Sequence, residues 1–264
     1  MYQVNYHRAA SVADAAKKAK GEAKYLSGGM TLIPAMKVRL ASPGDVIDLM
    51  HIKELKGIKV SGKSVTIGAA ATHAEVATND KLMKACPAVS YLAGHIGDPH
   101  VRHRGTIGGS IANNDPTADY PAALLALNAT IETNKRKISA DKFFTGLFGT
   151  ALKDGEIVTA VSFDIPAKAG YAKFPNPASR YALTGVFVAK DKSGVRAAVT
   201  GAGDDGVFRS KEIEAAIAKK FEAAALDDVK IPAKNLMSDL HASAEYRANL
   251  IKVMAKRAVA AANG

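Results

Sequence analysis

Two Gly-Gly segments constrain this 264-residue chain more than any other feature. The first, Ser27 to Thr31, reads SGGMT and stands between an expected strand, Lys24 to Leu26, and an expected helix, Met30 to Leu40. Glycines at such a turn let the backbone bend sharply and expose consecutive amide N–H groups. The helix start adds partial positive charge, so the segment is suited to bind a phosphate oxygen. Taken alone, the segment is better explained as a plain strand-to-helix turn.

The second segment, residues 105 to 121, combines the pair Gly108-Gly109 with hydroxyl, amide and carboxylate side chains. It is too polar for a buried strand, and its two isoleucines make it too apolar for a loose loop. We therefore expect this stretch to line a ligand site. Asp119 is expected to cap a helix from Tyr120 to Leu127, with Pro121 in its first turn.

Apolar periodicity and turn residues elsewhere predict an α+β fold. Pro166 to Gly170 is the expected linker to a C-terminal unit in which a sheet precedes helices. Further helices are expected at residues 12–20, 72–78 and 88–95, and strands at 46–49, 57–68 (a hairpin), 129–133, 157–165, 182–190 and 195–202.

The composition narrows the function classes. The 36 Lys and Arg against 25 Asp and Glu give a net charge of +11, but the basic residues alternate with acidic ones, as in residues 211–214. Because no aromatic-interleaved basic stripe is present, we do not expect nucleic acid as a partner. The single cysteine, Cys86, cannot by itself hold an iron–sulfur cluster, so any metal redox centre is expected on another chain.

The sequence also bears on location. No apolar run approaches the roughly 20 residues that a bilayer span needs. Residues 1–8 lack the charged start and apolar stretch of a secretory signal. A cytoplasmic protein without a membrane span is therefore expected.

Residues 27–37, SGGMTLIPAMK, and residues 104–119, RGTIGGSIANNDPTAD, together resemble the FAD-binding medium subunit of the molybdenum hydroxylases. This family includes xanthine dehydrogenase and aerobic carbon monoxide dehydrogenase. The resemblance continues through Lys173-Phe174 and residues 179–182 and covers nearly the whole chain.

The resemblance implies a domain organisation. Residues 1–166 would form an FAD-binding domain of the PCMH/vanillyl-alcohol-oxidase-like type, with subdomains at about 1–55 and 56–166 and the cofactor between them. Residues 171–264 would form a small α+β domain of the carbon monoxide dehydrogenase flavoprotein C-terminal type.

The resemblance also implies cofactors and partners. This chain would carry FAD and take electrons from two [2Fe–2S] clusters on a small partner subunit. A large molybdopterin subunit would oxidise the substrate, and the acceptor would be a quinone, NAD or oxygen. The expected assembly is a dimer of heterotrimers. The substrate stays open between carbon monoxide, an aldehyde and an N-heterocycle.

In this family both glycine pairs would direct backbone amides at the FAD diphosphate. Ile96 would lie on the adenine side, and Val158, or Ile157 beside it, near the flavin. Tyr181 would lie against the isoalloxazine, and Lys173 would stabilise the anionic reduced ring, unless it is an ordinary surface lysine. No residue of this chain would act on the organic substrate or bind a metal. The residues expected around FAD are Ser27, Gly28, Gly29, Met30, Thr31, Leu32, Ile96, Thr106, Gly108, Gly109, Ser110, Asn113, Asp119, Val158, Lys173 and Tyr181.

Two other functions stay open. A self-contained flavin reductase on the same fold would need its own substrate-binding and proton-donating groups in the C-terminal part, and no convincing set is present. A basic binding module without a redox role would hold no flavin.

Two further motifs are discounted. Residues 201–206 match G-x-G-x-x-G, but two carboxylates inside that loop would repel a diphosphate, so a turn is expected there. His100 and His103 lack partners at metal-ligand spacing and are expected to face solvent or the cofactor loop.

Overall fold

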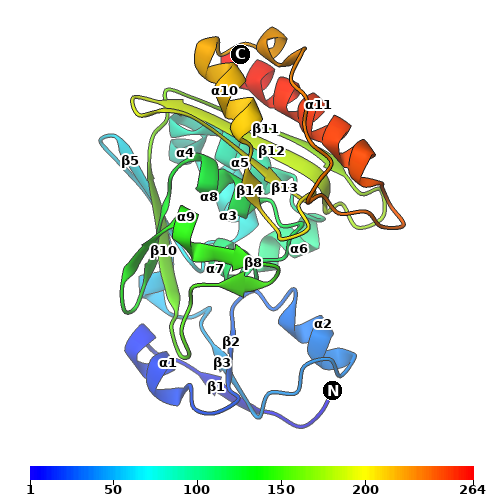
Figure 1. The fold of residues 1–264 in the computed structure, drawn as a ribbon. Coiled ribbons are helices and arrows are strands. Elements are labelled where there is room, and N and C mark those ends of the chain that lie inside the picture. Colours follow the sequence, from blue (N-terminus) through cyan, green and yellow to red (C-terminus); the bar gives the residue numbers. More distant parts are fainter.

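The computed structural model describes residues 1–264. Three larger β-sheets, with helices between and over them, form its framework, and β8 and β9 pair in a fourth, two-stranded sheet (Figure 1). The N-terminal sheet is parallel, in the order β1-β3-β2. Its own small core contains Ile47, Ile52 and Ala15. Its elements are β1 (Asn5–Arg8), α1 (Val12–Lys18), β2 (Lys24–Leu26), α2 (Leu32–Lys37), β3 (Asp45–Asp48) and the 3-10 turn η1 (Lys53–Leu55).

The second sheet is antiparallel, in the order β4-β5-β10-β6-β7. Its strands are β4 (Ile58–Ser61), β5 (Ser64–Gly68), β6 (Thr130–Thr133), β7 (Lys137–Ser139) and β10 (Val158–Asp164). Between β5 and β6 the chain forms α3 (His73–Thr78), α4 (Asp80–Ala85), α5 (Pro87–Gly94), α6 (Pro99–Arg104), α7 (Ile107–Asn113) and α8 (Tyr120–Ala126). Between β7 and β10 it forms α9 (Ala140–Phe143), β8 (Phe144–Gly146) and β9 (Gly149–Thr150).

The third sheet, in the order β11-β12-β13-β14, is antiparallel and lies at the top of Figure 1. Its strands are β11 (Lys168–Pro175), β12 (Ala182–Asp191), β13 (Gly194–Thr200) and β14 (Phe208–Arg209). The helices that follow are α10 (Lys211–Lys219), the 3-10 turn η2 (Ala223–Leu226) and α11 (Ala244–Asn263). None of the helices combines the length and apolarity that a bilayer crossing needs.

The third sheet is buried on both faces, so residues 182–189 of β12 are buried without a break. Because side chains alternate along a strand, Phe187 packs into the core formed with α5 and α8, while Val186 and Val188 pack under α10 and α11. The core that contains Phe187 also includes Ile67 of the second sheet. The C-terminal sheet therefore shares its largest core with the middle of the chain.

The structure confirms the α+β class and most of the expected strands. The strand at 24–26 and the hairpin at 57–68 form where expected. The expected linker was wrong in extent, because only residues 165–167 separate β10 from β11. The helix expected over 30–40 is shorter, since it begins at Leu32 and ends at Lys37.

Several short helices were not expected. α6 carries a run of His and Arg, and α7 contains the second glycine pair, so neither has an amphipathic pattern. Such short helices depend on tertiary packing and caps rather than on intrinsic propensity. The side chain of Asp98 accepts a hydrogen bond from Val101 N at 2.9 Å and caps α6, and Thr106 caps α7.

A buried arginine ties the third sheet to α11. Arg247 donates to the carbonyl oxygens of Leu183 and Gly201, at 2.7 Å each, and to the Asp239 carboxylate at 2.8 Å. Its side chain is only 2% exposed. The two carbonyls lie at the start of β12 and the end of β13, so Arg247 fixes the sheet edge where these strands meet.

Replacing Arg247 tests how much its hydrogen bonds to the sheet edge contribute to the stability of the fold. Arg247→Met is expected to lower the free energy of unfolding by about 3 kcal/mol, because it removes the buried donor shared by Leu183 O and Gly201 O and the cation that pairs with Asp239. Urea unfolding followed by circular dichroism measures this. Lys256→Met on the same helix removes an exposed ion pair with Asp227 and is the control, with a much smaller effect expected. Equal losses of unfolding free energy in the two variants would contradict this role of Arg247.

Candidate functional site

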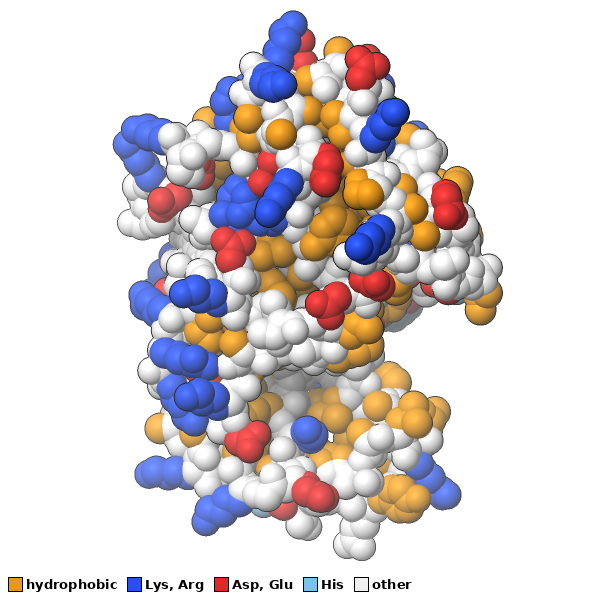
Figure 2. Space-filling model, viewed as in Figure 1, with side chains coloured by type: hydrophobic (Ala, Val, Ile, Leu, Met, Phe, Trp, Pro, Cys, Tyr) orange, Lys and Arg blue, Asp and Glu red, His pale blue; other side chains and the backbone are white.

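A long cleft of about 1300 Å³ separates the N-terminal part of the chain from the rest. Figure 2 shows the surface hollowed between these two parts. Both parts contribute walls, including residues 21–32 from one side and residues 105–119 from the other. The volume exceeds the roughly 300–1,000 Å³ of most small-molecule sites, so the cleft has room for an extended ligand.

The first glycine segment presents free amides to this cleft. None of the backbone N–H groups of residues 28–32 donates to another group of the chain. Gly29 has φ of +75°, which turns the backbone between β2 and α2. Consecutive unpaired N–H groups at a helix start form a site for an anion such as a phosphate.

The second glycine segment behaves differently, which corrects the expectation that both pairs offer their amides. Gly108 N donates to Ala69 O at 2.9 Å, and Gly109 N donates to Thr106 Oγ1 at 3.1 Å. A Cβ on Gly108 would lie 2.5 Å from Ala69 Cβ. The glycine at 108 is therefore required for close packing of α7 against the second sheet.

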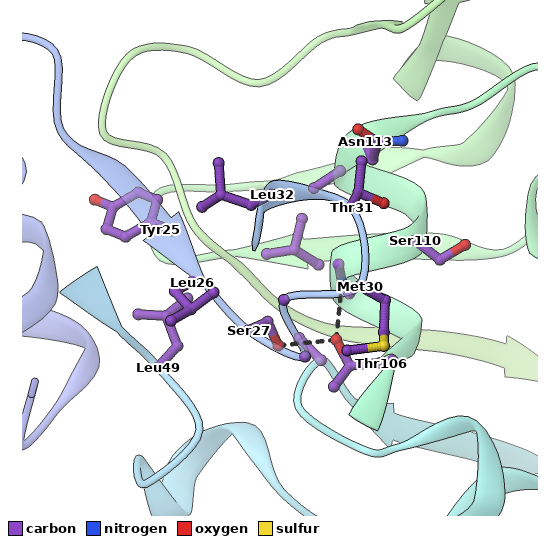
Figure 3. Close-up of a pocket in the computed structure, with 18 of the residues that line it drawn as sticks. Tyr25, Leu26, Ser27, Met30, Thr31, Leu32, Leu49, Thr106, Ser110 and Asn113 are labelled. Atoms are coloured by element: carbon purple, nitrogen blue, oxygen red, sulfur yellow. Dashed lines mark hydrogen bonds between the residues drawn. The ribbon is translucent and has the colours of Figure 1, made fainter. Parts of the chain in front are cut away.

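Polar side chains of α7 complete this wall of the cleft. In Figure 3, Ser110 and Asn113 project from α7 on the side where Met30 and Thr31 lie. The Asn113 amide supplies both donors and acceptors, and the hydroxyls of Thr31 and Ser110 supply either. The second segment thus contributes side chains to a ligand, while the first contributes backbone.

The two segments touch each other at the floor of the cleft. Ser27 Oγ lies 2.8 Å from Thr106 Oγ1, as Figure 3 shows. A Cβ on Gly28 would lie 2.0 Å from Arg104 O and 2.7 Å from Gly105 Cα. Only glycine at position 28 allows this approach of two backbones.

One end of the cleft is formed by Ile96, Asp98, Arg180 and Tyr181. The pKa of Asp98 is lowered by hydrogen bonds from the Val101 and His100 amides and, to a lesser degree, by the Arg180 guanidinium, which shows that these segments are neighbours. Tyr181 is 48% exposed, and its ring forms part of this end.

Another part of the cleft wall contains Tyr25, Gly155 and Val158, together with Lys135 and Lys153. The Tyr25 hydroxyl donates to Gly155 O at 3.1 Å, which joins β2 to the segment before β10. Val158 lies beside Thr159, whose carbonyl oxygen accepts from Ala69 N at 2.9 Å. The expectation that Ile96 lies on the adenine side and Val158 near the flavin stays a prediction.

Asp119 does not cap α8 with its side chain, contrary to expectation. Its carboxylate accepts instead from the Tyr171 hydroxyl and lies 3.0 Å from Lys173 Nζ, which also donates to His95 O at 2.9 Å. Burial raises the pKa of the Asp119 carboxyl, and the Lys173 ammonium opposes that rise. A buried carboxylate needs such partners, and because Asp119 bonds to Tyr171 and Lys173, its side chain does not cap α8.

The ion pair also locates Lys173. Its side chain is only 6% exposed and lies behind the cleft wall, so Lys173 is neither a surface lysine nor a lining residue. The other expected residues do line the cleft: Ser27, Gly28, Gly29, Met30, Thr31, Leu32, Ile96, Thr106, Gly108, Gly109, Ser110, Asn113, Asp119, Val158 and Tyr181.

Sequence reasoning missed Tyr25, His73 and Gly155 as lining residues. Tyr25 directly precedes the first glycine segment, and that position was a usable signal. His73 and Gly155 carry no local signal, since they reach the cleft only through the packing of α3 and of the segment before β10. Residues 201–206 form a turn, as expected, and His100 is almost fully exposed.

Comparisons with known proteins agree with this geometry. Residues 2–167 match a family model described as the FAD binding domain in molybdopterin dehydrogenase. The chain is 34% identical to the glyceraldehyde dehydrogenase medium chain of Sulfolobus acidocaldarius, over 97% of each protein. It is 34% identical to the carbon monoxide dehydrogenase medium chain of Afipia carboxidovorans, over 97% of this chain and 95% of that one.

Solved structures show the same likeness. Carbon monoxide dehydrogenase from Hydrogenophaga pseudoflava, in a form lacking the Mo-pyranopterin moiety of the molybdenum cofactor, contains a chain that superposes with a TM-score of 0.89. The two chains are 33% identical, and the alignment covers 99% of this chain and 97% of that one.

The packing role of the second glycine pair can be tested by a matched pair of variants. Gly108→Ala is expected to lower the free energy of unfolding by about 2 kcal/mol, because its Cβ collides with Ala69. In Gly109→Ala the new Cβ meets Thr106 Oγ1 at 3.0 Å and Ser27 Cβ at an ordinary contact distance of 3.7 Å, so stability is expected to change by less than about 1 kcal/mol. Urea unfolding of both variants provides the measurement. The interpretation fails should Gly109→Ala prove the more damaging.

Proposed function

We propose that this chain, which belongs to the FAD-binding domain family of molybdopterin dehydrogenases, transfers electrons within a larger enzyme complex. It is an FAD-binding subunit of the molybdenum hydroxylase family. In this proposal the electrons arrive from [2Fe–2S] clusters of a small partner subunit and leave to an external acceptor. When bound, FAD supplies the electron-transfer chemistry, and the protein supplies binding, orientation and electrostatics.

The observation that carries the proposal is the row of unpaired amides at residues 28–32, at the floor of a cleft long enough for a dinucleotide. A diphosphate bound there would be neutralised by backbone N–H groups and the start of α2, without a lysine. Thr31 and Ser110 would add hydroxyl donors from the two sides. The residues present therefore fit FAD.

The residues that line the cleft suggest the orientation of the cofactor. Tyr181 matches the aromatic that the family places against the isoalloxazine, so we place the flavin at its end, with Ile96. The adenine then lies toward Tyr25 and Val158, between the N-terminal sheet and β10. This assignment exchanges the roles that the resemblance alone suggested for Ile96 and Val158.

Lys173 serves this site indirectly in our proposal. The Asp119 carboxylate neutralises its ammonium, and the pair is shielded behind the wall. Lys173 would therefore hold Asp119 in place at the flavin end rather than contact the reduced ring. Asp119, which lines the cleft, would be the member of the pair that faces the cofactor.

This chain has too few cysteines to hold an iron–sulfur cluster, which supports partner subunits that hold the metal centres. The chain has one cysteine, Cys86, which is buried, while a [2Fe–2S] cluster needs four ligands. The curated relatives carry names such as medium chain, which denote subunits of larger enzymes. We propose a large molybdopterin subunit and a small iron–sulfur subunit as partners, with quinone, NAD or oxygen as acceptor.

Flavin titration tests the cofactor assignment. The purified chain is expected to bind FAD, and FAD at 100 times its Kd should raise the free energy of unfolding by about 2.7 kcal/mol. Gly28→Ala is expected to weaken binding by about 100-fold, because its Cβ forces the first segment away from Arg104. Fluorescence quenching of FAD measures both affinities.

Gly44→Ala is the control for this titration, since a Cβ at position 44 meets no atom within 4 Å. It should bind FAD like the unmodified chain. A properly folded chain that stays colourless and does not quench FAD fluorescence would refute the proposed function.

Affinity purification from the native cell tests the partner assignment. A tagged copy of the chain is expected to co-elute with two further polypeptides and with stoichiometric molybdenum and iron, measured by mass spectrometry and elemental analysis. A lone chain that turns over an organic substrate by itself would instead support a self-contained flavin reductase.

A further inference from the structure

His73, the first residue of α3, is a buried histidine in the cleft wall that none of the roles above uses. It is 4% exposed and lines the cleft next to the second glycine segment. Its backbone N–H donates to Gly105 O at 2.9 Å, which fixes the start of α3 against that segment. The position of the imidazole is therefore set by the fold.

The hydrogen bond on one side of the ring determines where the ring proton lies. His73 Nδ1 is 3.3 Å from the hydroxyl of Tyr120, and that buried hydroxyl has no other partner in the chain. A phenol without another acceptor donates its proton, so Nδ1 accepts and the proton of the neutral ring lies on Nε2. Burial lowers the pKa of His73 to about 4, so the ring is neutral at neutral pH.

The Nε2 side of the ring has no partner within the protein. It lies beside Gly105, where a Cβ would stand only 2.5 Å from Nε2. Glycine at 105 therefore leaves this edge of the imidazole uncovered toward the cleft. His73 Nε2 is not among the fully buried polar atoms, so from the cleft it is free to donate a hydrogen bond to a ligand.

The position along the cleft identifies the part of the ligand. Gly105 contacts Gly28 on one side and His73 on the other, so His73 is next to the proposed diphosphate loop. Val101, which also adjoins Gly105, continues from there toward Ile96 and the Tyr181 end. His73 thus lies on the flavin side of the diphosphate and far from Tyr25.

We propose that His73 is a cofactor-contacting residue whose Nε2–H donates a hydrogen bond to an oxygen of the flavin half of FAD, on the ribityl chain or the ring. This inference rests on the proposed function, namely that the cleft binds FAD. In this inference His73 is a side-chain donor specific for the flavin half of FAD, whereas the backbone amides of residues 28–32 bind the diphosphate.

Two isosteric substitutions separate the two nitrogens of the ring. In His73→Gln the side-chain amide reaches the position of Nε2, and in His73→Asn it reaches that of Nδ1. Both keep a polar amide in the same buried place, but only His73→Asn can replace Nδ1 as the partner of the Tyr120 hydroxyl, so a purely structural role would be damaged more in His73→Gln. His103→Gln, on an exposed face of α6, serves as the control and should change nothing.

The probes are FAD, riboflavin 5′-phosphate and ADP, titrated by fluorescence or calorimetry. His73→Asn is expected to lose about 5- to 10-fold in affinity for FAD and riboflavin 5′-phosphate and none for ADP, in line with one hydrogen bond. His73→Gln should stay within about 3-fold of the unmodified chain for all probes. Equal losses in both variants, a loss for ADP, or no loss at all would overturn the inference.

A second measurement avoids dependence on how well these variants fold. In the unmodified chain, the ¹⁵N resonance of His73 Nε2 should shift on adding riboflavin 5′-phosphate and stay in place on adding ADP. The inference would be overturned if the resonance shifted on adding ADP but not on adding riboflavin 5′-phosphate. Failure of the unmodified chain to bind FAD would instead refute the proposed function itself, so the two failures are distinguishable.

Discussion

The contact between Gly28 and the Arg104–Gly105 backbone is the constraint on which the site depends. It brings the turn after β2 against the end of α6, although these segments are more than seventy residues apart in the chain. The hydrogen bond between Ser27 and Thr106 fixes the same junction from the side-chain side. Because the N-terminal sheet has its own small core, this junction is one of the places where it is positioned relative to the rest.

The two glycine pairs solve different physical problems with the same residue type. At residues 28 and 29, glycine permits a close backbone approach and a positive φ, and the amides stay free for a ligand. At residue 108, the absence of a side chain avoids a collision with Ala69. The amides of Gly108 and Gly109 already donate hydrogen bonds within the chain. The second segment therefore acts on a ligand through side chains, whereas the first acts through its backbone.

Behind the cleft, buried polar groups connect the site to the third sheet. Asp119 is held by Tyr171 and Lys173, both of β11, and the end of β13 is tied to Pro116 by Gly201 N at 2.9 Å. The sheet is itself clamped at this edge by Arg247. The flavin end of the cleft is thus supported by residues far along the chain, which accounts for the core that the C-terminal sheet shares with the middle helices.

The sequence alone determined the α+β class and the strands with clear apolar patterns, and nearly all of the site residues that it singled out line the cleft, because glycine pairs and dense polar side chains are local signals. It did not determine α6 or α7, since these short helices exist only through caps and packing. Nor did it determine the partners of Asp119, the burial of Lys173 or the presence of His73 in the wall. Those features depend on which distant groups the fold brings within hydrogen-bonding distance, and only the tertiary structure decides that.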